Sequence, residues 1–247
     1  MTLATWANCA IGPVALLVLA LPGLARPQRK LVAVIVLLGC LDTGMTMLPV
    51  IDKALQLPGV HWNWAGKVFD LVAMAAVAIV LMATKTLSAS DIGLTFRQAP
   101  GTGRAVLFVV LPFLVILAVL TATLFGETSP QSSETILYEA TMPGLAEELF
   151  WRGILLALFD RLFTARFTLW GAEIGYGAFA TTAVFGLVHM MGFDDHLMVH
   201  FAWMGGLMAA VTGFLFAWIK TRSRSLVLPA LMHNATNVIL ETVPKLF

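Results

Sequence analysis

Three charged residues stand close together inside a long apolar stretch of this sequence: Glu147, Glu148 and Arg152. If the stretch crosses a membrane, each charge costs at least about 2.5–3.5 kcal/mol at the bilayer centre. Such a cluster must be paired, hydrated or functional. A buried carboxylate is also a residue type that general acid–base catalysis uses.

On a helix, these three residues have different environments. Glu148 and Arg152 are four residues apart, so they share a face and can pair. Glu147 points about 100° away and is left for chemistry. Burial without a nearby cation would favour its protonated form, as a general acid or base near neutral pH requires. The alternative is a charged triad that only locks helices together.

Two further pairs of residues lie on later apolar segments. Phe185 and His189 are four residues apart, and so are His233 and Asn237. His233 and Asn237 would project from one face, where two donors could stabilise a developing oxyanion. The alternatives are a packing histidine at position 189 and a hydrogen-bonded clasp between helices at Asn237. Asn234 lies about 100° round the helix from His233 and is left out of this set.

Composition indicates what must position these residues. The chain has 247 residues, of which 59% are hydrophobic and 12% charged, and its mean hydropathy is +0.88. Average soluble domains carry about 25% charged residues. We therefore expect an all-α, polytopic bundle that forms a single integral membrane domain. Cys9 and Cys40 lie in apolar runs and are expected to be small buried residues rather than a disulfide.

Hydropathy predicts eight membrane spans, and both ends of the chain fall on the same side. The predicted spans are about 6–24, 31–50, 64–84, 105–125, 134–162, 178–191, 197–219 and 226–244. The first four form an N-terminal part over about 1–133, and the others form a core over about 134–247. Eleven of the fifteen Lys and Arg residues fall on one side of this arrangement, which the positive-inside rule makes cytoplasmic. The segment 126–133, without basic residues, is then external.

Depth decides whether the three pairs can meet. At about 1.5 Å per residue, Glu147 lies about 20 Å from the cytoplasmic end of its span and His233 about 12 Å. His189 joins them only if the sixth span is short and begins near Ala178. A rival metal site is His196 and His200, preceded by Asp194 and Asp195, because histidines four residues apart on a helix can chelate zinc.

Together the pairs spell Glu-Glu-x-x-x-Arg at 147–152, Phe-x-x-x-His at 185–189 and His-x-x-x-Asn at 233–237. In this order, on consecutive apolar segments, they resemble the CPBP (CAAX protease and bacteriocin-processing, Abi) family of intramembrane proteases. That family includes the type II CAAX prenyl endopeptidases and bacterial bacteriocin-processing or self-immunity proteins. The resemblance covers about Leu137 to the end of the chain.

The resemblance implies a role for each position. Glu147 and His189 would activate a water molecule for attack on a peptide carbonyl, and His233 and Asn237 would hold the oxyanion. Supporting residues would be Glu148, Arg152 and Phe185. A metal-free mechanism with no cofactor is favoured, and if zinc is used, its ligands would be Glu147, His189 and His233.

We therefore expect an intramembrane endopeptidase of a prokaryotic cytoplasmic (inner) membrane. Its partners would be the lipid bilayer and a membrane-associated protein or peptide substrate, with no nucleic acid. Two other functions remain open: a non-catalytic scaffold or bacteriocin self-immunity protein on the same fold, and an ion-coupled transporter that uses the buried Glu and His residues as a proton relay.

Overall fold

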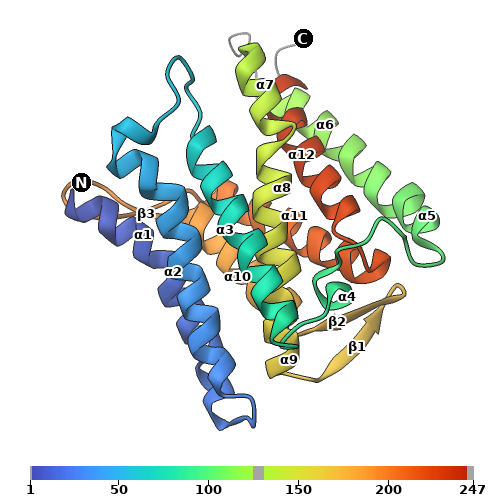
Figure 1. Ribbon diagram of the computed structural model, residues 1–247. Helices are drawn as coiled ribbons and strands as arrows, with labels where there is room; N and C mark the ends of the chain where they lie inside the picture. Colours follow the sequence, from blue (N-terminus) through green and yellow to red (C-terminus); the bar gives the residue numbers. More distant parts are fainter. Residues whose placement is uncertain (1, 125–130, 244–247) are drawn as a thin grey trace.

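Helices make up most of the computed structural model, which describes residues 2–124 and 131–243. In Figure 1 a central column of segments separates the N-terminal helices from the helices at the C-terminal end. The helices are α1 (Leu3–Ala20), α2 (Lys30–Ile51), α3 (Trp64–Ala83), α4 (Ala89–Ile92), α5 (Thr102–Ala105), α6 (Leu111–Leu124), α7 (Ser133–Glu139), α8 (Met142–Glu148), α9 (Leu156–Leu162), α10 (Tyr176–Met190), α11 (Trp203–Ser223) and α12 (Val227–Thr242). The strands are β1 (Arg166–Leu169), β2 (Ala172–Gly175), β3 (Met191–Phe193) and β4 (Val199–Phe201).

The chain is an integral membrane protein by the length and composition of its helices. Within the described residues, five helical stretches are long and apolar enough to cross a bilayer: Leu3–Ala25, Lys30–Ile51, Trp64–Ala83, Thr102–Thr123 and Trp203–Ser223. The first four match predicted spans one to four, and the last matches most of span seven. Phe125, the segment 126–130, Pro244 and Lys245, which the predictions also covered, lie outside the described residues.

The predicted fifth span is not one continuous helix. α7 ends at Glu139, and α8 begins at Met142 with Pro143 in its first turn, where a missing N–H costs nothing. A π-helical segment, Leu149–Leu155, then joins α8 to α9. π-Helical turns are rare and concentrate at functional sites, and this one carries Arg152.

The predicted sixth span corresponds to a short helix, as the meeting of the three pairs requires. α10 begins at Tyr176 and ends at Met190, so His189 lies in its last turn. The residues before it form an antiparallel β1–β2 hairpin, which turns at Trp170 and Gly171, both with positive φ. Glycine adopts this backbone conformation without the steric cost that Trp170 carries. The predicted depth condition for His189 is therefore met.

The seventh span begins later than predicted. Residues 191–201 form a second hairpin, in which β3 pairs with β4, and α11 starts at Trp203 rather than near Leu197. The chain is mostly helical, as expected of an all-α membrane protein, and two short two-stranded hairpins connect some of its helices. The prediction that both cysteines are buried was wrong, since Cys9 is partly exposed and Cys40 is exposed.

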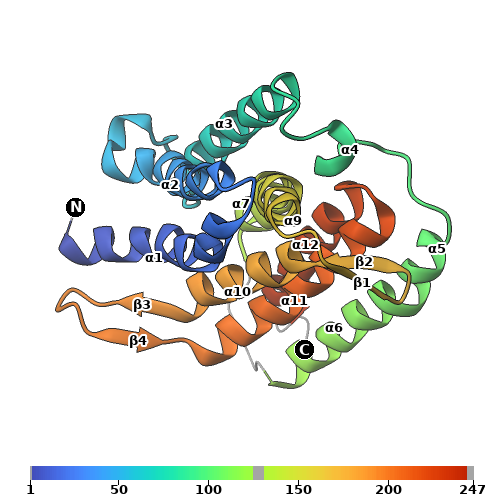
Figure 2. The ribbon, with the colours of Figure 1, turned by 90° about the horizontal axis from the view of Figure 1, so that it is seen from below.

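The column α8–α9 is the centre of the protein. α8 contacts α3 on one side and α12 on the other, and Figure 2 shows the yellow column between α1–α3 and α10–α12. Every residue from Leu149 to Phe159 is buried. A helix that is apolar all round is buried on all sides, so this segment can hold an internal charge away from lipid.

Candidate functional site

Glu148 is the hub of the buried polar cluster. Its Oε1 accepts a hydrogen bond from an Arg152 guanidinium nitrogen at 2.8 Å and another from His233 Nδ1 at 2.8 Å. Arg152 also donates to the Gly213 carbonyl at 3.1 Å. The Glu148–Arg152 pair agrees with the four-residue spacing, and the contact with His233 brings the third motif to the first.

Aromatic rings enclose the Arg152 guanidinium. Its carbon lies 4.5 Å from the centre of the Phe185 ring and 5.3 Å from that of Phe216, within cation–π range. Phe216 also stacks on His233, with ring centres 4.9 Å apart. Phe185, the predicted supporting residue, therefore contacts the cation, and its ring centre also lies 4.5 Å from that of His189 and 5.9 Å from that of His233. Phe216 is a supporting residue that the motifs did not reveal.

Both histidines have one ring nitrogen committed and the other available. His189 Nδ1 lies 2.7 Å from the Phe185 carbonyl, which can only accept, so Nδ1 carries the proton. His233 Nδ1 faces the Glu148 carboxylate in the same way. The Nε2 atom of each ring is left for the site, and His233 Nε2 lies 4.0 Å from Glu147 Oε2.

Glu147 has a cation partner, contrary to expectation. Lys67 Nζ lies 2.7 Å from Glu147 Oε1, and both side chains are largely buried. Lys67 comes from the first turn of α3, eighty residues earlier in the chain. The premise that Glu147 lacks a nearby cation was therefore wrong, because the partner comes from the N-terminal helices.

Asn237 faces the same region and is held by a residue that the motifs did not include. Its amide nitrogen donates to Glu139 Oε2 at 2.7 Å, from the end of α7. An amide nitrogen has two hydrogens, so one remains for a ligand. Asn234, set aside from the sequence, has a structural role: its Oδ1 accepts from the Gly144 N–H at 2.7 Å and ties α12 to the start of α8.

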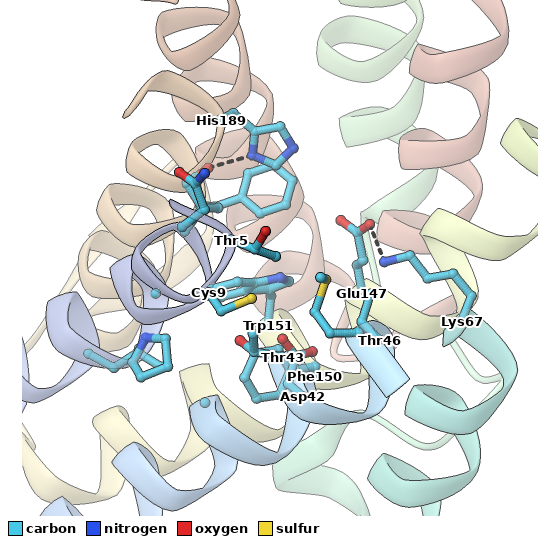
Figure 3. Close-up of a pocket in the computed structure, with 18 residues that line it drawn as sticks. Thr5, Cys9, Asp42, Thr43, Thr46, Lys67, Glu147, Phe150, Trp151 and His189 are labelled. Atoms are coloured by element: carbon cyan, nitrogen blue, oxygen red, sulfur yellow. Dashed lines mark hydrogen bonds and ion pairs between the residues drawn. The ribbon is translucent and has the colours of Figure 1, made fainter. Parts of the chain in front are cut away.

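Two cavities meet at Glu147 and His189. One, of about 480 Å³, lies among α1, α2 and α10 and includes Asn8, Cys9 and Asp42 in its wall. Figure 3 shows this cavity, with the Lys67–Glu147 contact at its side and His189 and Asp42 toward opposite ends. Asp42 of α2 lies in the wall of this cavity, close to Asp70 of α3.

The other cavity has a volume of about 790 Å³ and lies among α6, α7, α11 and α12. Leu117, Met208 and Leu240 contribute apolar surface to it. The polar residues of its wall include Glu139, Glu147, His189, His233 and Asn237, which form the candidate site. The structure thus brings all four predicted catalytic positions to the wall of one cavity.

The described side chains do not fit a zinc site. No group of three or more His, Cys, Asp or Glu residues in ranges 2–124 and 131–243 is arranged to hold a metal. Of the predicted ligands, Glu147 is bound to Lys67. His196 and His200 lie in the β3–β4 hairpin and not on a helix, so the geometry expected from their four-residue spacing is absent.

The Lys67–Glu147 contact carries a prediction. If the chain is the endopeptidase that the motifs predict, Lys67→Met should lower substrate cleavage at neutral pH by about 10- to 10³-fold, because a buried carboxylate without its cation takes up a proton. The acidic limb of the pH–rate profile should move to higher pH, so that raising the pH restores activity. Lys67→Arg, which keeps the charge, should retain most activity near neutrality. If the cleavage rate of Lys67→Met falls by the same factor at every pH and the acidic limb does not shift, Lys67 does not have this role.

Close packing at Gly144 leads to a second prediction. A Cβ there would lie 2.3 Å from the Ala230 carbonyl oxygen and 2.5 Å from Asn234 Oδ1. Gly144→Ala should therefore lower stability by about 1–3 kcal/mol, measured as a lower midpoint of thermal unfolding in detergent. Gly44→Ala is the matched control, because a Cβ there meets nothing within 4 Å on α2, and it should be neutral or stabilising. Equal midpoints for the two variants would refute the packing argument.

Comparison with known proteins agrees with the motifs. No curated protein and no solved structure matches the chain. One family model does match, and it covers residues 130–239, the part that contains Glu147, His189 and His233. The region that carries the three motifs is therefore similar to the family described as type II CAAX prenyl endopeptidase Rce1-like, which confirms the resemblance to CPBP intramembrane proteases.

Proposed function

We propose that this chain is an intramembrane endopeptidase in which Glu147 acts as the general base. The observation that carries the proposal is the convergence of Glu147, His189 and His233 on one cavity, with the Nε2 atom of each histidine uncommitted. Convergence of residues from three helices at a shared wall is difficult to explain by helix packing alone. The family match over 130–239 supports a peptidase of this type.

The proposed reaction uses a water molecule between Glu147 and His189. Glu147, kept ionised by Lys67, removes a proton from the water as the oxygen attacks the peptide carbonyl. The tetrahedral intermediate then has an oxyanion, which the second amide hydrogen of Asn237 stabilises. His233 adds a donor at Nε2 when both of its ring nitrogens carry a proton. Glu147 then gives the proton that it took from the water to the leaving nitrogen as the C–N bond breaks, which leaves a carboxylic acid on one product and an amine on the other.

The supporting residues place these groups. Glu148 orients His233 through Nδ1, and Arg152 neutralises Glu148 inside the protein. Glu139 orients Asn237. The larger cavity, with its apolar wall from α6, α11 and α12, would hold the apolar part of a membrane-associated protein or peptide.

The proposal extends to the whole chain. The four N-terminal spans and the core from about residue 134 form one membrane domain, because Lys67 and Glu147 join them at the site. Counting the segments α7–α9, α10 and α12 as spans gives eight crossings, in the cytoplasmic membrane of a prokaryote. No metal or cofactor takes part in the proposed steps.

Comparative proteomics of membranes tests the proposal. Cells that contain only Glu147→Ala, His189→Ala or His233→Ala protein should accumulate an uncut precursor that wild-type cells convert to a shorter product. Each variant must be present at wild-type abundance, measured by quantitative immunoblot. If cells with all three variants process every membrane protein as wild-type cells do, the chain is not a protease.

A further inference from the structure

Basic residues gather at one end of the molecule. Arg26, Arg29 and Lys30 line one surface hollow together with Arg161, which follows them by more than a hundred residues. Arg161 lines a second hollow with Arg166 and Lys220. The α9–β1 connection therefore lies next to both the α1–α2 connection and the end of α11. Figure 1 shows the α1–α2 and α9–β1 connections toward the lower end of the view.

This basic end holds most of the positive charge of the chain. Its residues are Arg26, Arg29, Lys30, Lys85, Arg97, Arg104, Arg161, Arg166, Lys220, Arg222 and Arg224. Within ranges 2–124 and 131–243, the opposite end carries only Lys53 and Lys67, and Lys67 is committed to Glu147. By the positive-inside rule, the basic end faces the cytoplasm.

The candidate site extends from mid-depth toward the opposite end, and its member nearest the basic end is His233, six residues from the start of α12. Lys67 is three residues from the start of α3, or about 5 Å at 1.5 Å per residue, and His189 is one residue from the end of α10. The smaller cavity begins at Thr5, in the first turn of α1, and includes Thr46, five residues before the end of α2. These ends of α1, α2, α3 and α10 are the ones remote from the basic connections.

The separation of the basic end from the cavities indicates the class of substrate. This inference rests on the proposed protease function. We propose that the site opens at the non-cytoplasmic face of the membrane and cuts a polypeptide that is exported or anchored there. A carboxyl-terminal tail in the cytoplasm, as in a prenylated protein, would meet the basic end and not the cavities. The scissile bond of the substrate therefore lies on the outer side of its own membrane segment.

The two native cysteines provide the test. Cys9 lines the smaller cavity, whereas Cys40 is exposed on α2 ten residues from the start of that helix, where lipid surrounds it. Thiols in lipid react poorly with a charged reagent because the reaction needs the hydrated thiolate. Cys40→Ala leaves Cys9 as the sole thiol, and Cys9→Ala leaves Cys40. Two further single-cysteine variants, Thr5→Cys and Arg97→Cys, are made in a background without native cysteines.

The probe is 2-sulfonatoethyl methanethiosulfonate, which does not cross membranes. It is applied to spheroplasts and to inside-out vesicles, and the thiols left unblocked are counted afterwards with a permeant maleimide. We expect Cys9 and Thr5→Cys to be blocked at least five-fold faster in spheroplasts, Arg97→Cys to be blocked faster in vesicles, and Cys40 to be unreactive in both. Adding Glu147→Ala should leave the side of the membrane from which each thiol is blocked unchanged.

Faster blocking of Cys9 and Thr5→Cys in inside-out vesicles would overturn the proposal. So would blocking of Arg97→Cys from the outer side, or failure of both cavity thiols to react from that side. Labelling does not depend on proteolysis, so an inactive chain with outward-facing cavities would reject the protease function and leave the sidedness intact. A precursor found by proteomics should also have its cut bond in an outer segment.

Discussion

Glu147→Gln should lower the rate of precursor cleavage by about 10²- to 10⁴-fold, which is the range that general acid–base catalysis contributes. The amide has nearly the same shape as the carboxylate, and its oxygen can still accept a hydrogen bond from Lys67, which bonds Glu147 Oε1 at 2.7 Å. Folding should therefore be preserved while the proton acceptor is lost. The measurement is the cleavage rate of the accumulated precursor, using purified enzyme in proteoliposomes.

The matched control for this change is Glu173→Gln. Glu173 lies in the β1–β2 hairpin at the basic end, where its carboxylate accepts from Thr168. The same replacement there should leave the rate within two-fold of wild type. If Glu147→Gln cleaves at a rate close to that of Glu173→Gln, Glu147 is not the base. A rate lost together with abundance would point to misfolding, which the unfolding midpoint measures separately.

The spacing of residues along the sequence predicted those features of the site that depend on a single helix. Glu148 and Arg152 pair because residues four apart share a face, and α10 is short because the polar and glycine-rich segment before it forms a hairpin. The placement of His189 followed from counting residues along that helix. These features need only the rise per residue and the ends of the helices, which the sequence indicates.

Contacts between distant segments could not be predicted in this way. Lys67 and Glu147 lie eighty residues apart, and Glu139 and Asn237 ninety-eight, so no spacing rule connects them. Their pairing depends on how α3, α7 and α12 pack around α8, which hydropathy does not determine. The break after Glu139 did have a local signal in Pro143, but a long apolar run outweighed it in the prediction of a continuous span.

Arg152→Met should lower the stability of the protein by about 3–5 kcal/mol. Methionine fills much of the space between Phe185 and Phe216, but it leaves the Glu148 carboxylate buried without its guanidinium partner. An unpaired buried charge costs far more than a lost surface pair. The expected result is a lower unfolding midpoint in detergent and reduced abundance in cells.

Arg161→Met tests whether burial is the cause. Arg161 also approaches a carboxylate, Asp91 at 3.9 Å, but both side chains are more than 40% exposed. Water and salt screen such a pair, so its loss should cost at most about 1 kcal/mol. Similar losses in the two variants would show that the Arg152 ion pair is no more important than a surface contact.

A double variant separates stability from activity. Arg152→Met combined with Glu148→Gln removes both charges, so it should recover part of the stability lost in Arg152→Met alone. The amide oxygen can still accept from His233 Nδ1, but the ring loses its charged partner at 2.8 Å, and cleavage should remain impaired. Recovery of full activity together with stability would mean that the pair only holds helices together. If the double variant recovers stability but not cleavage activity, the role of Glu148 is to orient His233.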